Sequence, residues 1–521
     1  GGFLIVALEH VWRKLRDEAA KKGWGDRQLF KREVELATRH FRGVDKDAFL
    51  AKVTKAYMAI VGDGRGGVFC ENSLDPPDDW PAAMRDKVSL GSFDVVLTNP
   101  PFGNKIVVKG ERVLSQYDLA YKWKKDAKAG LFQKTSALQD TEPPQVLFLE
   151  RCLQLLRPGG RLGIILPESL LGNPSYEHII AYLLGKTKLL GVVTMPEPLF
   201  KTSGKGGTHC KVCVLFIQKE IEERPYDVFF AEAKWCGHDS RGNPTIRKTS
   251  AGVSILLDDV PEIAARFRSL RGGTSAALDH HGFLLSSASI KDRILVPKYY
   301  DPELDNYLES LQATHELVVF SSLVSKKVIS VQTGIEIGKM AYGTGPIPFV
   351  RTSDISNWEI KADFKHGVSK EIYDQLKSQI DLCAGDILMV RDGSYLIGTT
   401  AIVTESDLPM LFQSHMYRIR VVKPDEIDPW LLFVCLNSLA VKRQIRAKQF
   451  TQDIIDTLGR RLLEIVLPFP KDPALRQRIA KETRETVLTR VRLRNRIREI
   501  ALEVEGLTSI PEEAQELLET L

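Results

Sequence analysis

The sequence has no hydrophobic run long enough to cross a membrane and little excess charge of either sign. Its apolar stretches, such as 189–193 and 212–217, have the length of buried strands, whereas a membrane helix needs about 20 apolar residues. The net charge of +5 is small, so a surface that binds nucleic acid must be local. These absences argue against a membrane partner and against a uniformly basic protein.

Cysteine is also scarce, at seven scattered residues in 521. This usage excludes a disulfide scaffold and favours a reducing, cytoplasmic compartment. Cys210 and Cys213 are spaced as C-x-x-C, with Cys236 and His238 further on, but residues 211–216 are typical of a buried strand. We therefore predict core and turn roles for these residues, and no metal site.

The chain also lacks an initiator methionine, because it opens on Gly1-Gly2-Phe3-Leu4. We therefore expect a further segment to precede Gly1 in the natural protein. The length suits roughly three domains, each with its own core.

The motif that organises the first half is Asn99-Pro100-Pro101-Phe102, which follows the strand-like run 93–98. Two prolines remove backbone donors and fix φ, so the strand must end there. The residue before each proline is extended, which holds an amide, a carbonyl and an aromatic ring together at the strand's end. In α/β folds that edge binds ligands. The alternative is a strand followed by a proline-rich turn.

Earlier segments also place notable residues at element ends. A helix is predicted over 3–22, entered through Gly1-Gly2, and such a glycine turn suits a carboxylate or phosphate. A short strand over 40–44 ends at Asp45, which could either accept bonds from ribose hydroxyls or cap the helix predicted over 48–60.

A third strand, 68–70, leads to Asn72-Ser73-Leu74, where a polar side chain could bond an adenine ring and an apolar one could pack on it. With the Asn99 strand, these βα units predict an open, doubly wound α/β sheet. Further strands predicted at 161–167, 189–195 and 212–218 complete it.

In order and spacing, these motifs resemble the amino-DNA methyltransferases, most closely the modification subunits of type I restriction systems. The resemblance implies a prokaryotic protein with a Rossmann-like methyltransferase domain over 1–238, whose N-terminal part, including half of the cofactor loop, is missing. It implies that S-adenosylmethionine is bound by Gly1, Gly2, Phe3, Asp45, Asn72, Ser73, Leu74 and Asn99. Many relatives have Asp where this chain has Asn72.

The resemblance also implies a mechanism in which Asn99, Pro100, Pro101 and Phe102 are catalytic. The adenine amine is a poor nucleophile, because its lone pair is delocalised into the ring. Hydrogen bonds from its two protons to the Asn99 side-chain oxygen and the Pro100 carbonyl favour a tetrahedral nitrogen and stabilise developing charge. Phe102 stacks on the flipped base. This chemistry needs no metal ion and no covalent enzyme intermediate.

Two later segments are expected to face the substrate. Residues 105–144 are long, polar and charged, which is typical of a mobile loop. Phe200 and Thr208 lie where relatives place base-pocket residues, although Phe200 could equally anchor its loop.

The second half has a different character. Residues 239–297 have weak periodicity and are predicted to be a bridging region, whereas 298–470 consists of short strands between turns, an α+β pattern. Its order of elements resembles the target-recognition domain of type I specificity subunits. The candidate DNA contacts are Arg351, Arg391, Tyr395, Lys442, Arg443, Arg446, Lys448 and Gln449. The alternative for 442–450 is a solvated helix face.

Residues 471–521 contain a long helix with a broken apolar stripe and many arginines. Specificity subunits use such helices as coiled-coil spacers, so this helix either packs on its own chain or pairs with a second copy.

The sequence therefore predicts a site-specific DNA adenine-N6 methyltransferase with its own recognition domain, from a restriction-modification or phage-defence system. Double-stranded DNA is the expected partner, and a restriction or translocase subunit is a further candidate. Three alternatives are a bifunctional enzyme with a nuclease upstream of Gly1, a non-catalytic DNA-recognition subunit, and a protein-glutamine methyltransferase.

Overall fold

The computed structural model describes residues 1–60, 67–103, 106–126, 128, 130–201, 211–273, 278–361, 364–393, 395–452, 455–504 and 506. The chain divides into two compact units. The first is Gly1–Ala277 with His281–Pro297, and the second is Leu278–His280 with Lys298–Leu521. No helix in the described ranges is long and apolar enough to span a bilayer.

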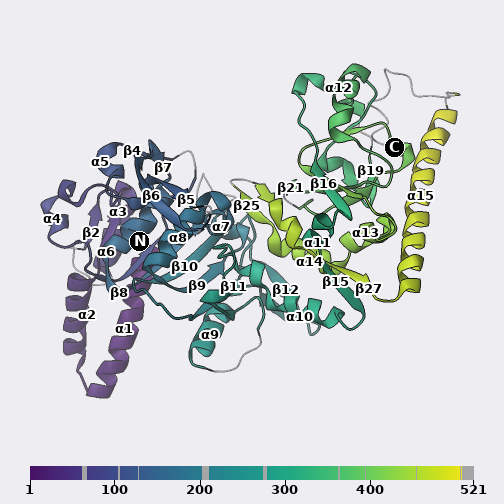
Figure 1. Cartoon of the computed structure of the whole chain (residues 1–521). Coiled ribbons are helices and arrows are strands. Elements are labelled where there is room, and N and C mark those ends of the chain that lie inside the picture. Colours follow the sequence, from purple (N-terminus) through teal and green to yellow (C-terminus); the bar gives the residue numbers. More distant parts are fainter. Residues whose placement is uncertain are drawn as a thin grey trace. The chain divides into compact units, whose positions relative to one another are not determined.

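The first unit begins with three helices and a pair of strands (Figure 1). These elements are α1 (Gly2–Lys22), α2 (Asp26–His40), β1 (Gly43–Asp45), α3 (Ala48–Ile60) and β2 (Val68–Cys70). The strands β1 and β2 pair in parallel. Leu8, Ala37, Met58 and Val68 form a small buried core between helices and strands.

The main sheet of this unit has six strands in the order β14-β11-β9-β10-β8-β3. Their bounds are β3 (Phe93–Thr98), β8 (Leu156–Pro167), β9 (Lys188–Thr194), β10 (Val212–Gln218), β11 (Asp227–Glu232) and β14 (Phe283–Ser286). The helices that follow or connect them are α4 (Ala82–Arg85), α6 (Pro144–Leu155), α7 (Glu168–Gly172), α8 (Glu177–Lys186) and α9 (Val260–Arg271). The predicted α/β fold class is confirmed.

The sheet differs from the predicted one in two respects. It is mixed, because β10 runs antiparallel to both β8 and β9. Among the described residues no α-helix joins β9 to β10, and a strand that returns without a crossover must run antiparallel. In addition, β1 and β2 form a sheet of their own instead of extending the sheet beyond β3.

Most of the segment 105–144 is folded, so the prediction of a mobile loop was wrong for its described residues. It contains β4 (Val108–Lys109), α5 (Glu111–Leu114), β5 (Tyr121–Lys125), β6 (Phe132–Leu138) and β7 (Thr141–Glu142). Leu114 and Tyr117 are fully buried against Leu74 and Leu147. This apolar burial supplies the stability that a polar loop lacks.

The second unit is built on a four-stranded antiparallel sheet in the order β16-β24-β20-β22. Its strands are β16 (Ile329–Thr333), β20 (Ile387–Val390), β22 (Thr400–Ile402) and β24 (Met416–Val421). The strands outside this sheet are β15 (His315–Val319), β17 (Phe349–Val350), β18 (Ile355–Ser356), β19 (Glu359–Ile360), β21 (Asp392–Gly393), β23 (Leu411–Phe412), β25 (Phe450–Gln452), β26 (Ile455–Thr457) and β27 (Val466–Pro470). Its helices are α10 (Pro302–Leu311), α11 (Phe320–Ser325), α12 (Lys370–Ile380), α13 (Pro429–Leu436) and α14 (Leu439–Lys448).

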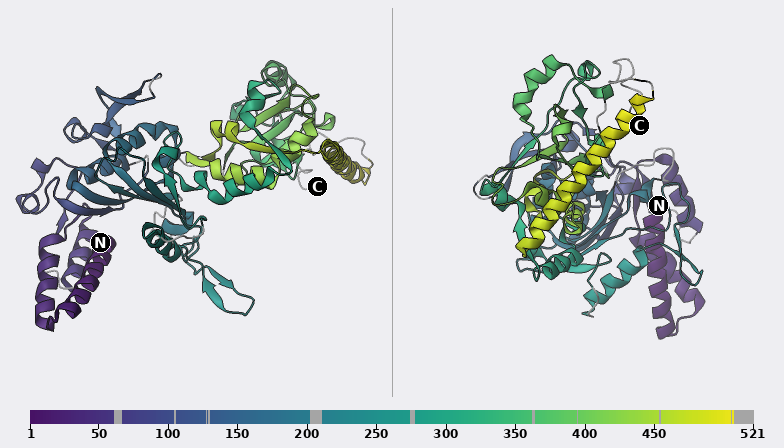
Figure 2. Two further views of the ribbon diagram at one scale, coloured as in Figure 1. Left: turned by 60° about the horizontal axis from the view of Figure 1, so that its bottom comes forward. Right: turned by 90° about the vertical axis from the view of Figure 1, so that its right-hand side faces the viewer.

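The long helix α15 (Pro473–Glu503), yellow in the right view of Figure 2, packs on its own unit. Ala480, Val487 and Val491 are buried in the same core as α13. Arg490 pairs with Glu359 and Arg494 with Asp407, each at 3.0 Å. The apolar residues nearer its end are exposed: Leu493, Ile497, Ile500 and Val504.

Two short strands outside these sheets, β12 (Ile246–Lys248) and β13 (Ser254–Leu256), form an antiparallel hairpin. They belong to the first unit, as does β14. The segment predicted to be a bridge therefore packs mainly with the first unit.

Candidate active site

The Asn99 turn directly follows β3, as the two prolines require. Asn99 is exposed and Pro100 is buried. Among the described residues, none donates a hydrogen bond to the Asn99 side chain or to the Pro100 carbonyl. Both acceptors therefore remain available to a ligand with two N–H donors.

Two aromatic rings from distant parts of the chain meet beside this turn. The Phe102 and Phe200 centroids are 6.5 Å apart, with the rings edge to face at 65°. Phe200 ends the short helix Glu197–Phe200, and both rings pack on a core that includes Met195 and Val212. The structure thus brings together two of the predicted base-pocket residues. Thr208 lies outside the described residues.

The N-terminus of α1 lies close to α3 and β1. A Cβ on Gly1 would overlap Thr54 Oγ1 of α3, so only glycine allows this approach. A Cβ on Gly43 would lie 3.2 Å from Leu4 Cδ2, which shows that α1 also contacts β1. The first turn of α1, which contains Gly2 and the half-exposed Phe3, has no acidic residue. Its positive dipole end is therefore not neutralised locally.

Asp45 lies at the end of β1, as predicted, and does not cap α3. Its Oδ1 accepts the Asp47 N–H at 2.9 Å, and Asp47 Oδ1 in turn accepts the Leu50 N–H at 2.8 Å. The capping role therefore belongs to Asp47. No described residue donates to Asp45 Oδ2.

The loop after β2 is held by its own polar groups. Asn72 Oδ1 accepts the Leu74 N–H at 3.3 Å, and Asn72 Nδ2 donates to Asp75 Oδ1 at 2.7 Å. Leu74 is only 3% exposed and packs in the protein core, so its side chain does not line an open site. Asn72 and Ser73 are the half-buried positions of this loop.

A buried arginine of α6, which sequence reasoning missed, holds this loop through hydrogen bonds to its carbonyl groups. Arg151 is 1% exposed, and its Nη2 donates to the carbonyls of Leu74 at 3.3 Å and Asp75 at 3.2 Å. Its Nε donates to the Tyr117 hydroxyl at 3.0 Å, and that hydroxyl donates to the Leu74 carbonyl at 2.7 Å. Burial raises the pKa of Tyr117 to about 12, so its hydroxyl remains a donor at neutral pH.

The sequence does contain a signal for this arrangement. Glu150 and Arg151 interrupt a helix that is otherwise apolar on most faces, and both are buried. Glu150 accepts the N–H groups of Asp118 and Leu119, each at 2.9 Å. Adjacent charges inside such a helix indicate internal partners, because unpaired buried charges are costly.

In the second unit, two predicted DNA-contacting arginines bind neighbouring side chains. Arg351 Nη2 lies 3.1 Å from Asp354 Oδ1, and Arg351 Nη1 lies 2.9 Å from His366 Nε2. Arg391 Nε donates to Asp392 Oδ2 at 2.8 Å, and its guanidinium lies 5.7 Å from the Tyr417 ring centroid.

Most of the predicted DNA contacts in residues 442–449, on and after α14, also bind other groups of the protein. Lys442 donates to the Gly398 carbonyl, and burial lowers the pKa of Lys442 to about 8. The other contacts are Lys448 with Glu464 at 2.9 Å, Arg443 with Asp301 at 4.0 Å, and Gln449 with Asp456 at 3.4 Å. Arg446 is exposed, and Tyr395 is 88% exposed.

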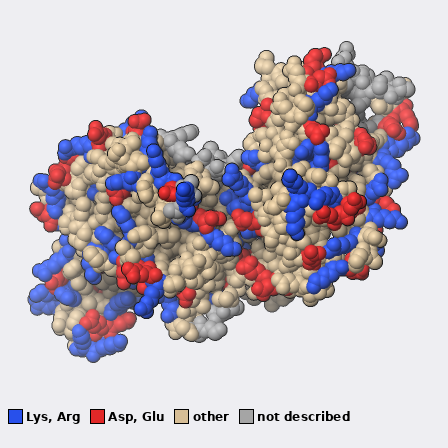
Figure 3. Space-filling model, viewed as in Figure 1, with Lys and Arg blue, Asp and Glu red and all other residues tan. Residues whose placement is uncertain are grey.

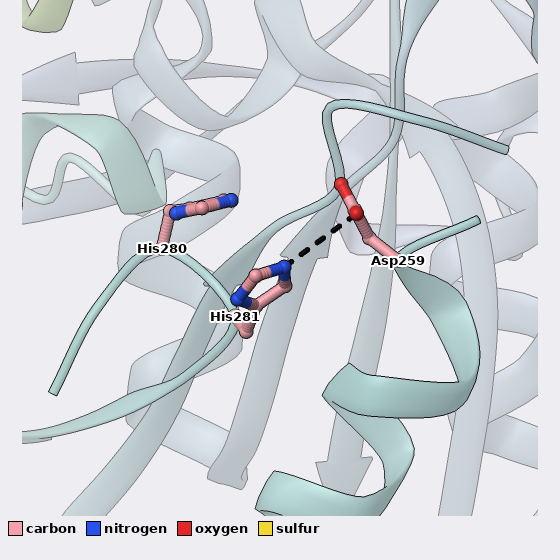
Figure 4. A group of neighbouring side chains, drawn as sticks. All are labelled: Asp259, His280 and His281. Atoms are coloured by element: carbon pink, nitrogen blue, oxygen red, sulfur yellow. Dashed lines mark ion pairs between the residues drawn. The ribbon is translucent and has the colours of Figure 1, made fainter. Parts of the chain in front are cut away.

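A pair of side chains in the first unit has metal-ligand chemistry. Figure 4 shows Asp259 and His281, whose Oδ1 and Nε2 atoms lie 3.5 Å apart. Asp259 Oδ2 accepts the Lys234 and Trp235 N–H groups, so both carboxylate oxygens are engaged. His280, also drawn, belongs to the second unit. We therefore assign no metal site to these residues.

The fold and these features define an α/β unit with a candidate ligand site after β3. Residues 1–249 match the family model described as N-6 DNA methylase. This range contains the Asn99 turn and every strand of the main sheet except β14.

Several solved structures are similar to parts of this chain. A modification subunit of a putative type I restriction enzyme from Vibrio vulnificus YJ016 is 16% identical, with 53% of this chain and 52% of that chain covered at a TM-score of 0.33. The type IIG restriction endonuclease BpuSI is 12% identical, with 86% and 55% covered at a TM-score of 0.39. A chain from a study of type I R-M system assembly is 17% identical, with 56% and 54% covered at a TM-score of 0.36.

This chain spans about half the length of these solved structures.

Proposed function

We propose that the protein is a DNA methyltransferase that transfers a methyl group from S-adenosylmethionine to the N6 amine of an adenine flipped out of the duplex. The observation that carries this proposal is the Asn99 turn, where two acceptors that receive no hydrogen bond from the described residues lie beside a pair of aromatic rings. The family match over residues 1–249 supports the same reaction class.

Each part of the turn has a role in this reaction. The Asn99 side-chain oxygen and the Pro100 carbonyl each accept a hydrogen bond from one N–H of the amine. These two bonds direct the nitrogen lone pair toward the methyl donor. Positive charge that develops on nitrogen is stabilised by these fixed dipoles. Phe102 stacks on the flipped base, and Phe200 forms a second apolar wall.

The polar groups at the ends of α1, β1 and β2 fit the proposed cofactor. Its carboxylate suits the N-terminus of α1, where no acidic side chain competes. Asp45 Oδ2 suits the ribose hydroxyls, and Asn72 or Ser73 suits the adenine. The cofactor supplies an activated methyl group, and the protein residues position it against the amine.

We assign target recognition to the second unit and place the enzyme in a restriction-modification or phage-defence system. Duplex DNA is the substrate, and a restriction or translocase subunit is the expected protein partner. Exposed Arg446 and Tyr395 are the best-placed of the predicted DNA contacts in this unit, since the other predicted cations already bind protein groups.

The test is radiolabelled methyl transfer to duplex DNA of many sequences. We expect Asn99→Ala to reduce transfer by at least about 100-fold, since it removes an acceptor that acts in the transition state. Binding of DNA should change little. The matched control is Asn306→Ala, which alters an exposed asparagine of α10. Wild-type transfer to glutamine side chains but not to DNA would contradict the proposal, as would full activity of Asn99→Ala.

A further inference from the structure

The β5–β6 hairpin is an arm whose inner face is anchored to the first unit. In the left view of Figure 2 it stands out as a blue hairpin at the top of that unit. Trp123 packs against His178 and Tyr182 of α8, with ring centroids 6.3 and 6.1 Å apart. Its Nε1 also donates to the Asp118 carbonyl at 3.1 Å. The arm is therefore held in a defined orientation.

Ion pairs strengthen this anchor. Lys125 Nζ lies 2.8 Å from Glu177 Oε2, and Lys134 Nζ lies 2.6 Å from Asp118 Oδ1. Arg293 donates to the Gly130 carbonyl near the hairpin's tip at 3.0 Å. Two of the hairpin's lysines are therefore used for attachment.

Three further lysines of the hairpin are not used in this way. Lys122 and Lys124 alternate with Trp123 along β5, so their side chains face away from the anchored side. Lys124 lies opposite Gln133 of β6, and Lys128 follows at the tip. All three lysines are exposed, and their ammonium groups make no ion pair or hydrogen bond with the described residues.

The chain path places this arm on the side of the sheet that carries Asn99. The hairpin is inserted between the end of β3 and the start of α6, and α6 leads back to β8, which is parallel to β3. A parallel pair requires such a crossover, so an insertion before α6 emerges at the carboxyl ends of the strands. Figure 3 shows Lys and Arg side chains distributed over this face of the first unit, with Asp and Glu side chains among them.

We infer that Lys122, Lys124 and Lys128 form a phosphate-binding face that holds the DNA backbone beside the flipped base. This inference rests on the proposed function. The Cα atoms of Lys122 and Lys124 are about 7 Å apart along an anchored strand, so the two side chains start from fixed positions on the same face of the hairpin. Such contacts add affinity and fix the register of the duplex without reading its sequence.

The test is a triple variant, Lys122→Gln, Lys124→Gln and Lys128→Gln, compared with Lys14→Gln, Lys52→Gln and Lys55→Gln. The control removes three exposed lysines from α1 and α3 of the same unit. Binding of a fluorescent duplex is measured by anisotropy across a salt series. We expect the slope of log affinity against log salt to become less negative by about 2–3 in the hairpin variant. The affinity of this variant for DNA at low salt should fall at least about tenfold. The control should stay near wild type.

Cofactor binding, measured by calorimetry, verifies that the hairpin variant is folded, and the corresponding triple Lys→Arg variant should restore DNA affinity. An unchanged salt slope in a folded hairpin variant would overturn the inference, as would equal losses in both triple variants. If the wild type methylates DNA while the hairpin variant binds normally, only this inference fails. If the wild type neither binds nor methylates DNA, the proposed function fails with it.

Discussion

The lysines of the β5–β6 hairpin and the basic residues of the second unit have the same chemistry but different surroundings. In the hairpin, Lys122, Lys124 and Lys128 are exposed, and their ammonium groups bind no described residue. In the second unit, Arg351 and Arg391 bind the aspartates at 354 and 392. Positively charged side chains are therefore unpaired and exposed in one region, and are bound to carboxylates of the same unit in the other.

This difference decides which positive charges are available to bind phosphate. A cation that already binds a buried carboxylate cannot reach phosphate without leaving that carboxylate unpaired, which is costly. Asp354 and Asp392 are both largely buried. We call a cation braced when it binds another group of the protein, and open when it is exposed and has no such partner. Removing a braced cation should therefore reduce the free energy of unfolding, and removing an open one should reduce DNA binding.

The largest expected effect is at the most deeply braced cation, Arg151. Arg151→Gln removes the side-chain donor to the Asp75 carbonyl, one of two donors to the Leu74 carbonyl, and the donor to the Tyr117 hydroxyl. We expect a loss of about 3–5 kcal/mol in the free energy of unfolding, measured in urea. Arg157→Gln is the control, because Arg157 pairs with Asp94 at the surface and should cost less than about 1 kcal/mol. Equal effects of the two variants would show that the Arg151 network does not hold the loop.

Arg351 and Arg446 test the comparison within the second unit. Arg351→Ala removes the two guanidinium hydrogen bonds to Asp354 and should reduce the free energy of unfolding by about 1–3 kcal/mol. It should leave the salt slope of DNA binding unchanged. Arg446→Ala should do the opposite, with stability unchanged and the slope reduced by about 1. The reverse pattern would show that Arg351 leaves Asp354 when DNA binds.

Lys442 gives a pH-dependent test of a braced cation. Burial lowers the pKa of Lys442 to about 8, so between about pH 8 and 10.5 the unfolded chain holds a proton that the folded protein has lost. Wild-type stability should therefore rise with pH across this window relative to Lys442→Met, by about 1–2 kcal/mol. Urea unfolding at pH 7.5 and 9.5 measures this difference. Parallel pH profiles would show that Lys442 is solvated.

The smallest expected effect comes from single lysines of β5. Lys124→Gln should change the free energy of unfolding by less than about 0.5 kcal/mol and reduce the salt slope of DNA binding by about 1. Lys125→Gln, one residue away, removes the pair with Glu177 and should leave the slope unchanged. Unfolding and anisotropy measurements check both variants. Equal slopes for Lys124→Gln and Lys125→Gln would remove the distinction between open and braced lysines.

Local features of the sequence predicted local features of the structure. The helix 48–60, the strand 68–70 and the end of β3 before two prolines follow from side-chain patterns and backbone restrictions, and all are present. The neighbouring Asp354 and Asp392 could also have indicated that Arg351 and Arg391 are paired, since they lie within three residues.

Long-range contacts were beyond such reasoning. The antiparallel course of β10, the burial of Tyr117 against Leu74 and the hold of Arg151 on the β2 loop depend on residues far apart in the sequence. The meeting of Phe102 and Phe200 was expected only through the family resemblance.

The most direct test of the central claim is methylation-sensitive sequencing of DNA from cells that express the protein. We expect N6-methyladenine within one recognition sequence in cells with the wild type and none in cells with Asn99→Ala. Expression and DNA binding of the variant should remain comparable. Unmodified adenines in cells with the wild type, or equal modification by Asn99→Ala, would contradict a methyl transfer centred on the Asn99 turn.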